Sequence, residues 1–390
     1  QEWTAALEGG SWQVSLAPSM TADGSTLLMS EPQLGYAPTQ LVEFQMTGAG
    51  YDARGVGVPG LPVVGIGYTR TVAWSLTTGN SKTIDTFVET VRPDADGDGS
   101  PEVLHDGAWV PLDCRTEVVR YREAPEGVPV GPPVQSEEHT VCLGPHGPVV
   151  SPSIDEIDDP EGEPAMAYQW HMRDRELDTV AGVLQWMRAR TADDIVASID
   201  DLTWNENIGW ADAFGNIGWW HPGIHLTKAD GVDLRLPTPG TGEYDNGDPL
   251  PVDALPHVVN PERGWIANWN NKPAHGWLDG GGESQASHSA GIDSRGATLD
   301  DTITARDDWT FEDLVELDRR ASSQDFRARH FLPMLLELQD DPTLDATERA
   351  ALDLLAGWDG SANGPGADMA FAGFDAGDEA TTVGAAPTIF

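Results

Sequence analysis

The sequence predicts an α+β protein built mainly on antiparallel sheets. Residues 11–92 alternate short apolar runs with Gly and Pro turns, which is typical of packed antiparallel strands. Residues 108–155 form a second strand-rich region, and helical spacing of apolar residues begins at 177–190. A chain of 390 residues can bury a substantial core, as one large domain or as two.

The first predicted strand begins at Ser11 and alternates apolar with polar residues. A strand has a side-chain period of two, so Trp12, Val14 and Leu16 share one face. A turn follows, and residues 25–29 return as a second strand. A serine at the start of a strand is common and by itself predicts no function.

Predicted helices are marked by capping residues. Thr191 precedes a helix expected to run to about residue 201, and Thr310 stands three residues before Asp313. Residues 345–348 open another helix, which we expect to end near Gly357.

The charge balance excludes nucleic acid as a partner. Lys and Arg number 22 against 64 Asp and Glu, giving a net charge of -42, so phosphate would be repelled. Concentrated salt screens the repulsion between like charges, so the net charge predicts a protein from a halophile.

The sequence has no run of 18 or more apolar residues, so it predicts no membrane-spanning segment, and no amino-terminal signal peptide is visible. Residue 1 is Gln, so we expect that an upstream segment was removed or omitted.

Two features leave alternatives open. Cys114 and Cys142 lie in neighbouring predicted strands, either as a disulfide suited to an exported protein or as two buried thiols of a cytoplasmic one. The loop with Asp94, Asp96 and Asp98 resembles a calcium loop, but the position that needs a bidentate Glu is His105. Structural calcium and a solvated acidic turn are the two interpretations of this loop.

Several motifs occur in a fixed order along the chain. The most specific is 264–271, a predicted strand that ends in clustered amides beside tryptophans. The others are 32–38, 48–52, 59–62, 65–68, 72–79, 84–89, 234–242 and 322–333. In order and spacing they resemble the nucleophile-bearing chain of the penicillin acylase family, one of the N-terminal nucleophile amidohydrolases.

The resemblance implies a fold and an organisation. It implies a four-layer αββα sandwich of antiparallel sheets, in which 1–10 is a linker or propeptide remnant. Residues 11–390 would form a β-chain domain truncated at its C-terminal end. The family's smaller α chain and a missing C-terminal segment would then be partners. An ungapped count back from Gln33 puts Ser11 at the nucleophile position and Gly10-Ser11 at the self-cleavage bond.

The implied chemistry is hydrolysis of a linear amide without a required cofactor. Cleavage would give Ser11 a free α-amine with a pKa near 8, so that one residue supplies both nucleophile and base. The resemblance makes the Asn270 side chain and the Thr78 main-chain N–H the oxyanion donors. It places Gln33 beside the serine, and Arg295 where it orients Asn270 and attracts a substrate carboxylate.

The substrate would be a small-molecule N-acyl compound. The resemblance places Leu34, Ile66 and Asn80 in the acyl pocket. These side chains are less aromatic than those of enzymes that take phenylacetyl groups, which predicts an aliphatic or small acyl chain. The same resemblance gives His146, in the motif 146–150, a structural role.

Three positions depart from the family pattern. Trp12 follows the nucleophile where Asn is usual, and Lys82 and Ser284 replace two acidic calcium ligands, although Asp85 remains. These departures support an alternative hypothesis. The chain would then be an inactive or incomplete acylase-like fragment that acts only as a structural or binding protein.

Overall fold

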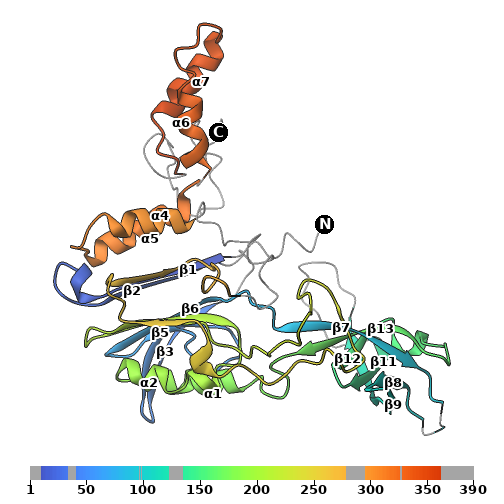
Figure 1. Ribbon diagram of the computed structural model, residues 1–390. Coiled ribbons are helices and arrows are strands. Elements are labelled where there is room, and N and C mark those ends of the chain that lie inside the picture. The colour runs from blue at the N-terminus through green and yellow to red at the C-terminus, as the bar shows by residue number, and fades with distance from the viewer. Residues whose placement is uncertain are drawn as a thin grey trace.

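The computed structural model describes residues 10–33, 41–95, 97, 99–122, 135–277, 295–325 and 327–361. Its strands form three sheets (Figure 1). The first sheet is antiparallel and has three strands in the order β18 (Trp265–Asn268), β1 (Gly10–Leu16) and β2 (Leu27–Gln33).

The second sheet is antiparallel and lies against the first. Its order is β17 (His257–Val259), β15 (Ile217–Trp220), β14 (Glu206–Asp212), β6 (Val72–Thr78), β5 (Ile66–Tyr68), β4 (Tyr51–Gly57) and β3 (Val42–Gly48).

The third sheet extends to one side of these two layers (Figure 1). A disulfide joins Cys114 and Cys142, which face each other across its first two strands. Its order is β10 (Asp113–Tyr121), β11 (Gln135–Gly144), β12 (Gly147–Ser151), β13 (Glu163–Trp170), β7 (Ile84–Arg92), β8 (Glu102–His105) and β9 (Ala108–Pro111), with β16 (Thr238–Pro239) parallel to β7.

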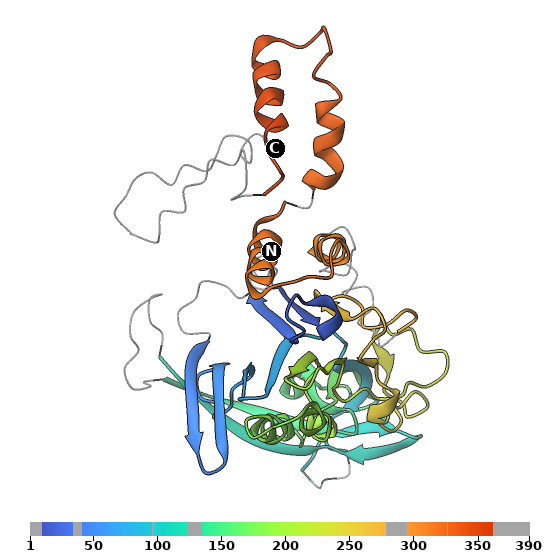
Figure 2. The same ribbon diagram turned by 90° about the vertical axis from the view of Figure 1, so that its left-hand side faces the viewer.

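Helices cover the outer faces of the first two sheets. In Figure 1, α4 (Arg295–Thr304) and α5 (Phe311–Ser323) lie over the first sheet, while α1 (Asp178–Trp186) and α2 (Ala192–Val196) lie under the second. The αββα layering and the antiparallel sheets implied by the sequence are therefore confirmed. A further pair, α6 (Ala328–Leu336) and α7 (Ala346–Ala356), stands away from the sheets in both views (Figures 1 and 2).

Strand β1 is buried on both faces, and its alternation separates two kinds of packing. Trp12, Val14 and Leu16 pack against apolar side chains of α4 and α5, as their shared face predicts. The opposite face carries Ser11, Gln13 and Ser15, all buried against the second sheet. Buried polar groups need hydrogen-bond partners, so β1 presents a polar face to the second sheet, while Ile217, Trp219 and Ile266 form an apolar cluster between the same two sheets.

The predicted caps are correct, but two helices are shorter than predicted. Thr191, Thr310 and Asp345 are the N-cap residues of α2, α5 and α7. The predicted helix 177–190 spans Asp178–Trp186, and α2 ends at Val196, with a short 3₁₀ turn over Ile199–Asp201.

A side-chain hydrogen bond explains the end of α2. The Ser198 hydroxyl donates to the Ile195 carbonyl and accepts from the Trp186 indole N–H at 2.7 Å. A hydroxyl that bonds nearby backbone competes with helix continuation.

Among the described residues, none of the helices is both long enough and apolar enough to cross a membrane. Residues 1–9 of the predicted linker lie outside the described residues, and Gly10 is the first residue of β1.

Candidate active site

Ser11 lies near the start of β1, where the side chain of Asn270 forms hydrogen bonds with both its main-chain nitrogen and its hydroxyl. The Ser11 main-chain N–H donates to Asn270 Oδ1 at 2.7 Å, and Asn270 Nδ2 donates to Ser11 Oγ at 2.9 Å. Ser11 is 5% exposed and Asn270 3% exposed, so water competes little for these bonds. The amide therefore fixes the position of the hydroxyl relative to its own backbone nitrogen.

Asn270 reaches Ser11 because the chain turns sharply after β18. Its φ of 62° lies in the left-handed region, which Asn tolerates better than most residues. Asn268 Oδ1 accepts from the Asn270 N–H at 3.2 Å and from the Thr77 hydroxyl at 2.6 Å. Asn271 Oδ1 accepts from Asn268 Nδ2 at 3.0 Å. The clustered amides of the motif 264–271 thus bond one another and the second sheet.

Arg295, the first residue of α4, lies behind Asn270. Its Nη2 donates to Asn270 Oδ1 and to the Trp269 carbonyl, both at 3.0 Å, and its Nη1 donates to Gln33 Oε1. Burial lowers the pKa of Arg295 to about 10, so the guanidinium stays charged at neutral pH. The positively charged guanidinium that donates to Oδ1 polarises the amide, and this polarisation makes Nδ2 a stronger hydrogen-bond donor toward Ser11.

Thr78 ends β6 beside the same amide, but its main-chain carbonyl makes the contact. Thr78 O accepts from Asn270 Nδ2 at 3.0 Å and from Asn207 Nδ2 at 3.1 Å. The Thr78 N–H as an oxyanion donor stays a prediction. Gly79 follows, where a Cβ would lie 2.4 Å from Asn205 Oδ1, so a side chain at this position would have to displace the Asn205 amide.

An apolar pocket of about 120 Å³ lies beside the end of β6. Ile66 lines it together with Leu76 and Trp204. Asn80 has a φ of 58° in the segment after β6, and Leu34 lies outside the described residues.

Glu206 also lines this pocket, and the sequence analysis missed it. It faces Thr78 in the β6–β14 pairing, and burial raises its pKa to about 8, so the carboxyl is neutral at pH 7. The alternation of side chains along a strand could have identified it, because this alternation puts Glu206 on the same face as the core residues Ile208 and Trp210.

Ammonium groups surround Asp85, the acidic position that the resemblance associates with calcium. Lys82 Nζ lies 3.3 Å from Asp85 Oδ1, while Lys228 Nζ and His171 Nε2 contact Oδ2, the latter at 2.8 Å. Burial alone would raise the pKa of Asp85, but hydrogen bonds from His171 and Lys228 lower it well below its ordinary value. Asp85 is therefore a carboxylate paired with protein cations.

The candidate calcium loop is described only in part. Asp94 accepts from the Gly97 N–H at 2.7 Å and from the Gly99 N–H at 3.0 Å, which closes a turn. Asp96 and Asp98 lie outside the described residues.

The family model for penicillin amidase matches residues 1–376. The chain belongs to the penicillin amidase family. It is 29% identical over 349 residues to the penicillin G acylase of Escherichia coli. The aligned residues cover 88% of this chain and 38% of that protein. It is 26% identical over 264 residues to the acyl-homoserine lactone acylase QuiP of Pseudomonas syringae pv. tomato, covering 66% of this chain and 29% of that protein.

Solved structures agree with this assignment. The thermostable penicillin G acylase from Alcaligenes faecalis superposes with a TM-score of 0.73 at 25% identity, over 90% of this chain and 60% of that one. The chain therefore spans between 29% and 60% of the lengths of these three relatives.

Proposed function

We propose that this chain is the nucleophile-bearing part of an amidohydrolase that cleaves linear amides of N-acyl compounds. The observation that carries the proposal is that one asparagine amide, that of Asn270, forms hydrogen bonds with both the Oγ and the backbone nitrogen of Ser11. Family membership supports it, since the relatives are named as penicillin G acylase and acyl-homoserine lactone acylases.

Activation would require cleavage of the Gly10–Ser11 bond. An amide nitrogen shares its lone pair with its carbonyl and is not a base. Attack of Ser11 Oγ on the Gly10 carbonyl breaks the C–N bond and forms an ester. Water then hydrolyses the ester to a Gly10 carboxylate and a free Ser11 α-amine, whose pKa near 8 suits a base at neutral pH.

The same groups would then act on substrate. The α-amine takes the Oγ proton as Oγ attacks the acyl carbonyl, and the oxyanion that forms faces Asn270 Nδ2 and the N–H of Thr78. The amine returns its proton to the leaving nitrogen, and water hydrolyses the acyl-enzyme. Arg295 raises the donor strength of Asn270 and attracts carboxylate-bearing substrates, while Gln33 holds Arg295.

The pocket beside Thr78 supports an aliphatic or small acyl group. Ile66 and Leu76 supply apolar walls, and neutral Glu206 adds one polar group at the β14 side. Hydrolysis rates of aliphatic and phenylacetyl anilides, measured on the chain together with its family partner segments, test this assignment. We expect faster hydrolysis of aliphatic anilides and no hydrolysis by Ser11→Ala, with Ser15→Ala on the same strand as a control. A clear phenylacetyl preference would refute the acyl assignment, and an active Ser11→Ala would refute the function.

We also propose that the protein is exported and works at high salt beside the family's smaller α chain and a further C-terminal segment. The Cys114–Cys142 disulfide supports an oxidising compartment, and the net charge of -42 supports high salt. Thermal unfolding measured from low to molar NaCl should show a rising midpoint as like charges are screened. A midpoint that does not change with salt would contradict the halophilic assignment.

A further inference from the structure

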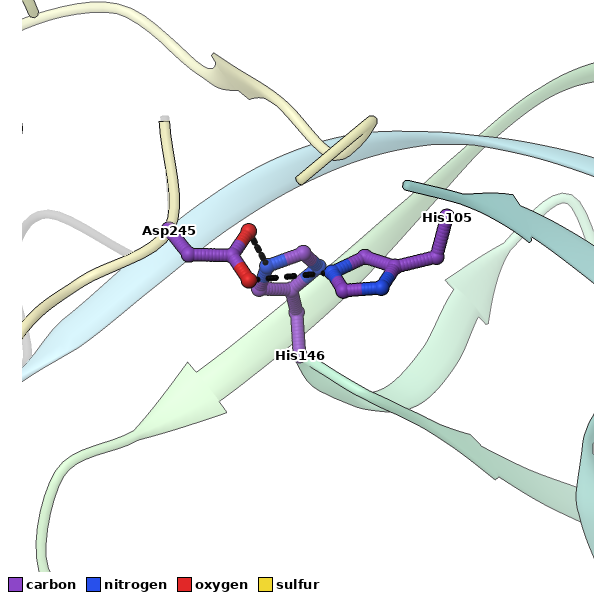
Figure 3. A group of neighbouring side chains, drawn as sticks. All are labelled: His105, His146 and Asp245. Carbon is purple, nitrogen blue, oxygen red and sulfur yellow. Dashed lines mark hydrogen bonds and ion pairs between the residues drawn. The ribbon is translucent and has the colours of Figure 1, made fainter. Parts of the chain in front are cut away.

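Two imidazoles and one carboxylate meet on the third sheet, and they come from three separate segments (Figure 3). His105 ends β8, His146 lies in the turn between β11 and β12, and Asp245 lies in the segment after β16. His105 Nε2 is 2.9 Å from Asp245 Oδ2, and His146 Nε2 is 2.8 Å from Asp245 Oδ1. The three ligand atoms all lie within 4.8 Å of one another.

A buried carboxylate fixes the orientation of His146. Its Nδ1 is 2.7 Å from Glu89 Oε1, and its ring stacks on Phe87 with 3.8 Å between centroids. Glu89 and His146 are each 1% exposed. With Nδ1 donating to Glu89, loss of the Nε2 proton on metal binding would leave the Nε2 lone pair directed at the other two side chains. The same carboxylate–histidine arrangement orients imidazole ligands at metal centres.

A divalent ion would also balance the charge of the cluster. Once the ion displaces the protons held between each imidazole Nε2 and Asp245, the imidazoles are neutral, and Glu89 and Asp245 together carry two negative charges. Glu89 Oε2 is buried and accepts no hydrogen bond from the described residues. The segment that leads to Asp245 passes close to this oxygen, since a Cβ on Gly240 would lie 2.1 Å from it. A buried carboxylate without full compensation is costly, and one divalent ion would balance both charges.

We propose that His105, His146 and Asp245 bind a divalent transition-metal ion, for which Zn²⁺ is the best fit. Two imidazole nitrogens and one carboxylate are a typical zinc ligand set with an open position for water, whereas calcium prefers oxygen ligands alone. Zinc–ligand distances of about 2.0–2.2 Å need only small side-chain rotations from the hydrogen-bonded positions. Binding displaces protons shared between each Nε2 and the Asp245 carboxylate. The ion would tie β8, the β11–β12 turn and the segment after β16 together, and it shares no residue with the Ser11 site.

Isothermal titration of the chelator-treated protein with Zn²⁺ tests the proposal. We expect saturation at one ion per chain. When Co²⁺ replaces Zn²⁺, the protein should show the visible absorption bands of a low-coordinate Co²⁺ ion bound by nitrogen and oxygen ligands. His105→Ala should weaken the affinity at least tenfold and remove the bands, because one of three ligands is lost. The matched control is His139→Ala, which removes an exposed imidazole from β11.

Circular dichroism establishes that each variant is folded. If His105→Ala does not fold, Asp245→Asn preserves shape and hydrogen bonding while removing the charge, and it should weaken Zn²⁺ at least tenfold as well. The acidic surface gives weak, non-saturating binding that all variants share. The proposal is overturned if only that background is seen, or if a folded variant at His105 or Asp245 binds Zn²⁺ as tightly as the unaltered protein.

Discussion

Two buried polar clusters hold opposite ends of the segment 79–83, and they use different chemistry. At the end of β6, neutral amides surround Ser11 and Thr78, with the single charge of Arg295 behind them. At the start of β7, Asp85 is surrounded by ammonium groups and an imidazole.

The difference separates reacting groups from anchoring groups. Amides donate and accept hydrogen bonds at little desolvation cost, so they can position a hydroxyl and later receive an oxyanion without moving charge. A buried carboxylate is stable only while its cations remain in place, which suits a fixed anchor. Substitutions in the first cluster should therefore change rates, and those in the second should change stability.

The largest expected effect is that of Asn270→Ala on catalysis. The loss of Nδ2 removes the side-chain oxyanion donor, which should lower kcat about 10²–10³-fold in a variant that circular dichroism shows to be folded. Steady-state kinetics on the best anilide measure this effect. A kcat within threefold of the unaltered protein would show that the amide does not act on the transition state.

Asp85→Asn should mainly destabilise the fold. It leaves Lys82 and Lys228 without their carboxylate, and breaking such a buried pair costs about 3 kcal/mol in free energy of unfolding at pH 7. The folded-state pKa of Asp85 is lowered, so its stabilisation is present above the unfolded pKa of about 4 and is lost as the pH falls below it.

Urea unfolding at pH 7 and at pH 3 checks both statements. Asp52→Asn, which removes an exposed ion pair with Arg70, is the control and should cost less than about 1 kcal/mol. Equal losses for the two variants at pH 7 would contradict the anchoring role of Asp85.

Glu206→Gln sharpens the comparison, because Glu206 is a carboxyl whose pKa shift comes from burial alone. The folded protein keeps this proton up to about pH 8, whereas the unfolded chain loses it near 4.5, so stability should fall as the pH rises between these values. Glu206→Gln should remove that fall and raise the free energy of unfolding at pH 9 by about 1–3 kcal/mol. Urea titrations from pH 5 to 9 measure it, with exposed Glu312→Gln as control. An unchanged pH slope would mean that Glu206 is already ionised at neutral pH.

Much of the fold was predictable because it depends on local signals. Alternation gave the two faces of β1, and Thr310 and Asp345 marked helix starts through their own side chains. Ser11 and Asn270 are 259 residues apart, so only a resemblance to a family could pair them before the structure did.

Other contacts carried no such signal. His105, His146 and Asp245 stand on three separate segments, and nothing in their spacing along the chain indicates that they meet. The same holds for Lys228 and Asp85, which are 143 residues apart. Glu206 differs from both, since strand alternation placed it on a core face and its omission was an error of interpretation.

The most direct test of the central claim is intact-mass spectrometry of this chain expressed with its natural flanking sequence. We predict a new amino terminus at Ser11 in the unaltered protein and an intact Gly10–Ser11 bond in Ser11→Ala. Amide hydrolysis by a protein whose Gly10–Ser11 bond remains intact would contradict the account, because the base that it requires would not exist.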